Sequence, residues 1–357
     1  KPYDDEDAAA ALDRLTKAAG GSIAVRPLPE GASVRRRLVT AAKTLRAERA
    51  MRRRFDPHWS IASFSALARA ADIDDQEIGD RDLDPAMPPP AIIGSTGHGA
   101  AERLTGNMHL FPGGAHAGNF FHQLFEMMDY RRIDPKRLKV RVAAELDRFG
   151  FDRQWASAVT LLIENVLTTP LTSKGDSFCL NRLGPRDCVK ELPFCFPLNR
   201  LSAEALRQVF IRHDLPFAVG DVDGQLKRLN FVLSGGYLRG FVDLVFRFQG
   251  RYFLLDWKSN LLGPVYADYR PDRIETAMTE AYYFLQYHLY ALALDHFLRL
   301  RLPDYDHATH LGGVYYLFIR GMRPDHGSDC GVFFDRPSAN LLHDLGQLLV
   351  NPEPPNR

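Results

Sequence analysis

The stretch "DLVFRFQGRYFLLDWKSN", residues 243–260, decides the fold and raises the main question about the chemistry. Apolar residues alternate with other residues on both sides of positions 249–250, a Gln-Gly pair, which is typical of two β-strands joined by a two-residue turn. Counting outward from this turn places Asp243 directly opposite Asp256. Like charges with Cβ atoms roughly 5 Å apart are destabilising, so the pair should need a cation between its carboxylates.

Lys258 completes a candidate hydrolytic site on this hairpin. It lies two residues after Asp256 and shares its face, whereas Trp257 belongs to the opposite, apolar face. Two carboxylates completed by water molecules suit a hard divalent cation such as Mg²⁺. A lysine beside that cation could orient an attacking water and stabilise a phosphoryl transition state, as a metal-dependent phosphodiesterase requires. The alternative is an exposed Asp and Lys cross-strand pair without a catalytic role.

Composition sets broader limits on the class of protein. The chain has 357 residues, of which 45% are hydrophobic, enough for a large core, and its net charge of +1 gives no overall basic field for nucleic acid. The sequence has no apolar run of transmembrane length and no signal peptide, so we expect no membrane association. Its four cysteines form no C-x-x-C pair, which fits free thiols and a cytoplasmic location. A start without methionine is expected of a piece of a longer chain.

Three segments are expected along the chain. Residues 1–75 contain an alanine-rich helical stretch, a basic stretch at 34–55 and a short alternating strand at 59–64. Residues 76–104 have the acidic, Pro- and Gly-rich composition of a linker. Residues 105–357 alternate helical and strand patterns, including one long helix near 274–300, and predict one mixed α/β domain. The basic stretch could contact phosphates, or it could be a solvated helical face.

Two helical patterns carry further candidates. In "FPGGAHAGNFFHQLFEMMDY" a glycine turn leads into an amphipathic helix, where His122 and Glu126 lie one turn apart. His122 could be a metal ligand or a structural histidine, with His116 as a rival ligand. In "AYYFLQYHLY" Gln286 and Tyr290 are one turn apart, and they could bind a phosphate, hold Lys258 in place or simply pack in the core.

Together "FPGGAHAGNFFHQLFE", "GFVDLVFRFQGRYFLLDWKSNLLG", "LQYHLYALAL" and "HLGGVYYLFIRG" resemble the C-terminal nuclease region of the RecB (beta) subunit of bacterial exodeoxyribonuclease V. That region is a member of the PD-(D/E)XK superfamily, which implies an α/β fold with a restriction-endonuclease-like mixed central β-sheet flanked by helices. The resemblance covers about residues 105–350 and preserves order and spacing. It extends weakly upstream to "WSIASFSAL", which is similar to the end of a helicase domain, so residues 1–75 would be a helicase remnant.

The resemblance implies roles residue by residue. His122, Asp243, Asp256 and the backbone carbonyl of Trp257 would bind Mg²⁺, for which Mn²⁺ or Ca²⁺ would substitute in binding, and Lys258 would be the catalytic lysine. Gln286 and Tyr290 would match the Q-x-x-x-Y motif near the site. Val242 departs from the proline in the superfamily name. The cysteines do not reproduce the four-cysteine cluster of the superfamily's iron–sulfur nucleases, and no G-x-x-x-x-G-K-[ST] loop is present, so no ATPase motif is expected.

The function implied by the resemblance is Mg²⁺-dependent exo- and endonucleolytic hydrolysis of DNA during double-strand-break processing and recombination. The implied partners are single strands from unwound duplex DNA, RecC-like and RecD-like subunits and RecA. One alternative is an idle nuclease fold that binds DNA or docks a protein, although such a module would have no use for the Asp243, Asp256 and Lys258 charge cluster. Another is a surface for loading the recombinase RecA, which could coexist with cleavage.

Overall fold

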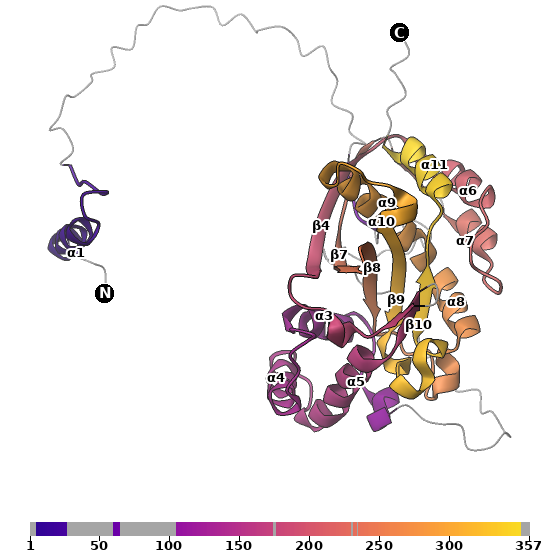
Figure 1. The fold of residues 1–357 in the computed structure, drawn as a ribbon, viewed down its shortest axis with the longest axis horizontal. Helices are drawn as coiled ribbons and strands as arrows, with labels where there is room; N and C mark the ends of the chain where they lie inside the picture. Colours follow the sequence, from indigo (N-terminus) through magenta and orange to yellow (C-terminus); the bar gives the residue numbers. More distant parts are fainter. Residues whose placement is uncertain are drawn as a thin grey trace, which may run out of the picture. The chain divides into compact units, whose positions relative to one another are not determined.

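The computed structural model describes residues 5–26, 60–64, 105–173, 176–229, 231–233 and 235–350 (Figure 1). The chain divides into two compact units, Lys1–Phe55 and Asp56–Arg357. In the first unit the predicted alanine-rich helix is present as α1 (Asp5–Ala18). The basic stretch at 34–55 and the predicted linker at 76–104 lie outside the described residues, so the three predicted segments and their boundaries stay predictions.

The second unit is built on a six-stranded mixed sheet. Strand β7 pairs antiparallel with β4 and β8 and parallel with β1, whereas β9 pairs parallel with β8 and antiparallel with β10. The strands are β1 (Ser60–Ala62), β4 (Cys188–Leu198), β7 (Gly236–Phe248), β8 (Arg251–Lys258), β9 (Leu311–Phe318) and β10 (Val332–Asp335). Strand β1, which comes from the alternating pattern at 59–64, is thus part of this sheet.

Helices flank the sheet, which confirms the predicted α/β class. Figure 1 shows α3, α4 and α5 grouped at one end of the sheet, and α6, α7, α9 and α11 grouped toward the other. The helices are α3 (Ala115–Met127), α4 (Pro135–Arg148), α5 (Ala156–Thr168), α6 (Ala203–Ile211), α7 (Val222–Arg228), α8 (Pro271–Glu280), α9 (Tyr283–Arg301), α10 (His307–His310) and α11 (Ala339–Leu349). Two small ladders complete the unit: β2 (Leu171–Ser173) with β3 (Asp176–Phe178), and β5 (Leu201–Ser202) with β6 (Val232–Leu233).

The predicted hairpin is confirmed. Strands β7 and β8 pair from Phe248 with Arg251 back to Leu244 with Leu255, in the register that the sequence predicts. The turn residues Gln249 and Gly250 have φ of 48° and 78°. Two consecutive positive φ values match a two-residue turn whose twist suits the flanking strands, so the turn fixes the register of the whole hairpin.

The predicted single helix near 274–300 is wrong, because the structure has two helices there. Helix α8 ends at Glu280 and α9 begins at Tyr283. Between them Tyr282 is in the left-handed conformation, with φ of 55° and ψ of 21°, which cannot continue a right-handed helix. No glycine marks this break, so helical periodicity alone gave no signal of it.

Helix α9 is a core helix rather than an amphipathic surface helix. Every residue from Tyr283 to Asp295 is buried, and the helix contacts β4, β8 and β9 of the sheet as well as α8 and α11. Strand β9 is buried on both faces along its whole length, as expected for a central parallel strand. Side chains that α9 directs at the sheet are therefore buried and closely packed.

Candidate metal site at the fork of β7 and β8

The sheet splits into a fork at Asp243. Strand β4 pairs along one edge of β7 from Gly236 to Phe246, while the other edge pairs with β1 at positions 236–238 and with β8 at 244–248. The predicted direct pairing of Asp243 with Asp256 does not occur, because the ladder ends one position earlier. Instead the Trp257 backbone N–H donates to Asp243 Oδ2 at 2.8 Å. The carboxylate thus replaces a backbone partner and holds the two strands apart at the site.

Helix α3 brings His122 to this fork. The helix follows Gly114, whose φ is 85°, and its buried side includes Phe125, whose ring stacks on Trp257 at 4.0 Å between centroids. His122 Nδ1 lies 3.3 Å from Asp243 Oδ1, and His122 Nε2 lies 3.0 Å from the Trp257 carbonyl oxygen. Three of the predicted metal-binding groups therefore converge. Glu126, one turn along α3, is exposed.

His116 does not join this group. Its Nε2 lies 2.8 Å from the backbone carbonyl oxygen of Phe149, and its ring packs against Phe149 and Phe151. These contacts connect the start of α3 to the end of α4. The structure therefore places His116 in a structural contact and His122 at the fork.

Asp256 and Lys258 lie next to this group and are buried. Lys258 Nζ forms an ion pair with Asp256 Oδ2 at 2.8 Å, and this buried carboxylate oxygen has no other polar partner among the described residues. Burial and the nearby charge of Asp243 raise the pKa of Asp256 to about 7. A buried carboxylate that has only one cationic partner and lies beside a second carboxylate is an environment that a hard cation would stabilise, so the donor set fits Mg²⁺.

His122 and Asp243 change each other's pKa in opposite directions. Burial disfavours both charged forms. The attraction between the two groups and their hydrogen bond outweigh burial, so they raise the pKa of His122 to about 9 and lower the pKa of Asp243. The site without a cation therefore contains an imidazolium and a carboxylate in contact. A metal ion bound by His122 must displace that proton, since only the neutral ring is a ligand.

A chain of hydrogen bonds from α9 holds Lys258. The Lys258 ammonium donates to Gln286 Oε1 at 3.1 Å, and Tyr316 OH donates to the same oxygen at 2.9 Å. Gln286 Nε2 in turn donates to Tyr290 OH at 3.1 Å. The ammonium also lies 3.9 Å from the centre of the Tyr283 ring. Of the roles that the sequence left open for Gln286 and Tyr290, this geometry matches support of Lys258.

Glu191 is a candidate ligand that the sequence did not predict. Ligand atoms of His122, Glu191 and Asp243 all lie within 4.8 Å of one another. The register of β4 and β7 puts Glu191 opposite Asp243, and its φ of 48° interrupts the regular ladder there. The available signal was the alternating strand "CVKELPFC", but no short turn connects β4 to β7, so the sequence alone did not fix their register.

A buried arginine connects the segments around the site. Arg320 is 2% exposed and donates to the backbone carbonyl of Ser259, the residue after Lys258, at 2.7 Å. Its other nitrogens donate to the carbonyls of Met108, Phe111 and Pro112, which precede α3. Carbonyl dipoles rather than a carboxylate thus satisfy this cation, and they fix the end of β8 against the start of the segment that carries His122.

The mixed sheet is flanked by helices and carries Asp243 and Asp256 where β7 and β8 diverge. This arrangement defines a restriction-endonuclease-like fold. No protein-family model matches the sequence. It is 35% identical to the RecBCD enzyme subunit RecB of Escherichia coli over 82% of this chain and 23% of that protein. It is 33% identical to RecB of Mycolicibacterium smegmatis over 97% of this chain and 34% of that protein.

RecB of Haemophilus influenzae is 34% identical over 66% of the chain. These comparisons identify the chain as RecB-like, in agreement with the resemblance of its motifs. The chain spans about a fifth to a third of the length of these relatives. Among the described residues, no helix combines the length and the apolar character that crossing a membrane requires.

Proposed function

We propose that the chain is the Mg²⁺-dependent deoxyribonuclease part of a RecB-type helicase–nuclease subunit, which hydrolyses DNA phosphodiesters by exo- and endonucleolytic cleavage during double-strand-break processing. The observation that carries this proposal is the convergence of His122, Asp243 and the Trp257 carbonyl beside Asp256, whose buried Oδ2 has no polar partner other than Lys258 among the described residues. The similarity to RecB subunits supports it.

Each residue would have a defined part in the reaction. Asp243, Asp256, His122 and the Trp257 carbonyl would hold the cation, with Mn²⁺ or Ca²⁺ able to take its place in binding. When bound, a divalent cation would polarise the phosphoryl group and favour deprotonation of a water molecule. Lys258, fixed by its hydrogen bond to Gln286, would orient the attacking water and stabilise the negative charge that develops on phosphorus-bound oxygens as the 3′ oxygen leaves.

The wider setting of this activity is also a proposal. We infer that residues 1–75 are the end of a helicase domain, residues 76–104 a linker and residues 105–357 the nuclease domain. The partners would be single-stranded DNA and RecC-like and RecD-like subunits, because the relatives are named as subunits of a RecBCD enzyme. In the described part of the chain, no feature favours a surface for loading RecA.

The test combines metal binding with cleavage. Mg²⁺ or Mn²⁺ is titrated into the wild-type chain and into Asp243→Asn by isothermal calorimetry, while labelled linear DNA reports cleavage. The proposal expects the substitution to remove both binding and cleavage, since it removes a ligand and the partner of His122. Metal binding without cleavage of any DNA would contradict the nuclease assignment. Cleavage by Asp243→Asn at the wild-type rate would contradict the site.

A further inference from the structure

The exposed side of the ribbon formed by β4 and β7 carries aromatic and basic side chains directly beside the proposed metal site. Residues opposite each other in an antiparallel pair lie on the same face. Moving away from Glu191 and Asp243 along this face, the successive opposed pairs are Pro193 with Phe241, Cys195 with Arg239, and Pro197 with Tyr237. The face is therefore continuous with the residues that would hold the cation.

These side chains are accessible although the ribbon itself is firmly packed. Phe241 is 50% exposed and Tyr237 is 39% exposed, and Arg239 between them is also exposed. The alternate residues point inward, where the Phe194 ring packs edge-on against Tyr290 of α9 at 5.2 Å between centroids. Two exposed aromatic rings on one face of a packed strand, next to the proposed metal site, offer a surface on which a ligand could stack.

The charge of this face suits a polyanion. Neither strand carries an acidic residue at positions 192–198 or 236–242, and Arg239 supplies a positive charge between the two rings. Alternate strand residues are about 7 Å apart, so the face from Tyr237 to Asp243 is about 20 Å long. Aromatic rings that stack with successive bases, combined with a cation for the backbone, are the usual means of binding single-stranded nucleic acid without sequence preference.

The same ribbon is poorly suited to a strand added by a protein partner. Strand β4 pairs only with β7 among the described residues, so its outer side is an edge of the sheet. Pro193 and Pro197 lie on this strand and have no N–H group to donate to an added strand. Protein docking by extension of the sheet is thus disfavoured, whereas stacking on the exposed face is not.

We propose that Phe241, Arg239 and Tyr237 form a track for single-stranded DNA that delivers a strand to the fork at Asp243. The two rings stack with bases, and Arg239 contacts the intervening phosphate. The track rests on the proposed nuclease function for its purpose, but it is a separate binding surface, because none of its three residues is a proposed metal ligand. Its length corresponds to about four nucleotides.

Binding is measured without metal, so that it is independent of cleavage. The full 357-residue chain is titrated in EDTA against a fluorescein-labelled oligothymidylate, with anisotropy as the readout. Phe241→Ala and Tyr237→Ala are each expected to weaken binding about tenfold, the usual effect of losing one stacking ring. Arg239→Gln is expected to lower the slope of log affinity against log salt by about 0.7. Phe297→Ala, an exposed ring on α9, is the matched control and should bind as wild type.

Cys195 offers a direct footprint of the track. It is the exposed cysteine of the chain and lies opposite Arg239, whereas Cys179 and Cys188 are half-buried and Cys330 is buried. Bound oligothymidylate should slow the reaction of Cys195 with a maleimide, followed by mass spectrometry. Protection of Cys195 should be lost in Phe241→Ala at the same oligonucleotide concentration.

The outcomes separate the track from the nuclease proposal. If wild type binds oligothymidylate and Cys195 is protected while no DNA is cleaved with Mg²⁺, the track is supported and the nuclease assignment is wrong. If wild type cleaves DNA but the two alanine variants bind and cleave as it does, with Cys195 unprotected, the track is wrong. Absence of any binding to oligothymidylate in EDTA also overturns the track.

Discussion

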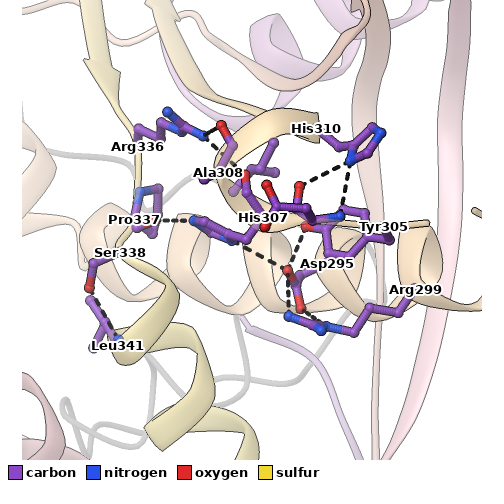
Figure 2. Close-up of polar contacts among 12 residues, drawn as sticks. Asp295, Arg299, Tyr305, His307, Ala308, His310, Arg336, Pro337, Ser338 and Leu341 are labelled. Carbon is purple, nitrogen blue, oxygen red and sulfur yellow. Dashed lines mark hydrogen bonds and ion pairs between the residues drawn. The ribbon is translucent and has the colours of Figure 1, made fainter.

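Two buried aspartates of this chain have opposite electrostatic environments. Asp295 of α9 is 3% exposed and accepts hydrogen bonds from Arg299 Nε at 2.7 Å and Tyr305 OH at 2.6 Å, with His307 Nδ1 at 3.4 Å (Figure 2). Burial alone would raise its pKa, but the hydrogen bonds from these partners lower it to about 2. Asp256 at the fork is 2% exposed, and its pKa is raised to about 7.

The two side chains have nearly the same exposed fraction, but their charged and hydrogen-bonding partners differ. Figure 2 shows Asp295 surrounded by donors from its own helix and from the segment that follows it. Asp256 has Lys258 on one side and the like charge of Asp243 on the other. A carboxylate that the chain satisfies by itself stabilises the fold. A carboxylate that the chain leaves short of positive charge is suited to a cation from solution.

The largest effect is expected from Lys258→Met. The variant should lose at least about 100-fold in Mg²⁺-dependent cleavage of single-stranded DNA, because a preorganised charge at the phosphoryl group is removed. Steady-state rates on labelled DNA measure it. Arg299→Met, which removes a cation from the other aspartate, is the matched control and should cleave at the wild-type rate. If both variants lost the same cleavage activity, the surroundings of Asp256 and Asp295 would not differ in function.

Asp295→Asn should destabilise the fold by about 2 kcal/mol at pH 7. The folded pKa lies below the unfolded value, so the ionised carboxylate stabilises the folded state fully above pH of about 4. This contribution is lost as the pH falls toward 2, where the folded carboxylate also binds a proton. Urea denaturation of both proteins at several pH values measures the difference. If the difference in unfolding free energy between the two proteins stays constant down to pH 2, Asp295 does not stabilise the fold through its charge.

Gln286→Ala should lower kcat about tenfold and leave KM nearly unchanged. Its Oε1 accepts from Lys258 and from Tyr316, so its loss lets the ammonium move from its position at the fork. Tyr290→Phe removes the hydroxyl that accepts from Gln286 Nε2 but keeps the ring, and its effect should be smaller. A rise in KM at constant kcat would instead assign Gln286 to substrate binding.

The smallest effect on stability is expected from Asp256→Asn in EDTA. The substitution removes a like charge beside Asp243, so the unfolding free energy should stay within about 1 kcal/mol of wild type or increase. The rise in melting temperature that Mg²⁺ gives wild type should disappear in this variant and persist in Asp295→Asn. A loss of stability in Asp256→Asn as large as in Asp295→Asn would make both carboxylates structural.

The sequence predicts the hairpin because the two strands are adjacent in the chain and joined by a short turn. The turn at 249–250 fixes which residues of β7 and β8 are neighbours, so Asp243, Asp256 and Lys258 could be grouped without the structure. His122 is 135 residues from Trp257 in the chain, and only the family resemblance indicated that they meet. Nothing local linked Glu191 to Asp243, and Tyr282 broke a helix without a glycine to mark the position.

The position of Arg320 in the sequence affects when the site can assemble during synthesis. Its guanidinium donates to the backbone carbonyl of Ser259 and also to the carbonyls of Phe111 and Met108, which lie 209 and 212 residues before Arg320. During synthesis on the ribosome, the strands that carry Asp243 and Lys258 emerge well before this residue does. The connection that fixes His122's segment against the end of β8 can therefore form only after residue 320 has left the exit tunnel. A nascent chain shorter than this would carry the acidic residues without the hydrogen bonds of Arg320 that connect them to the segment before α3.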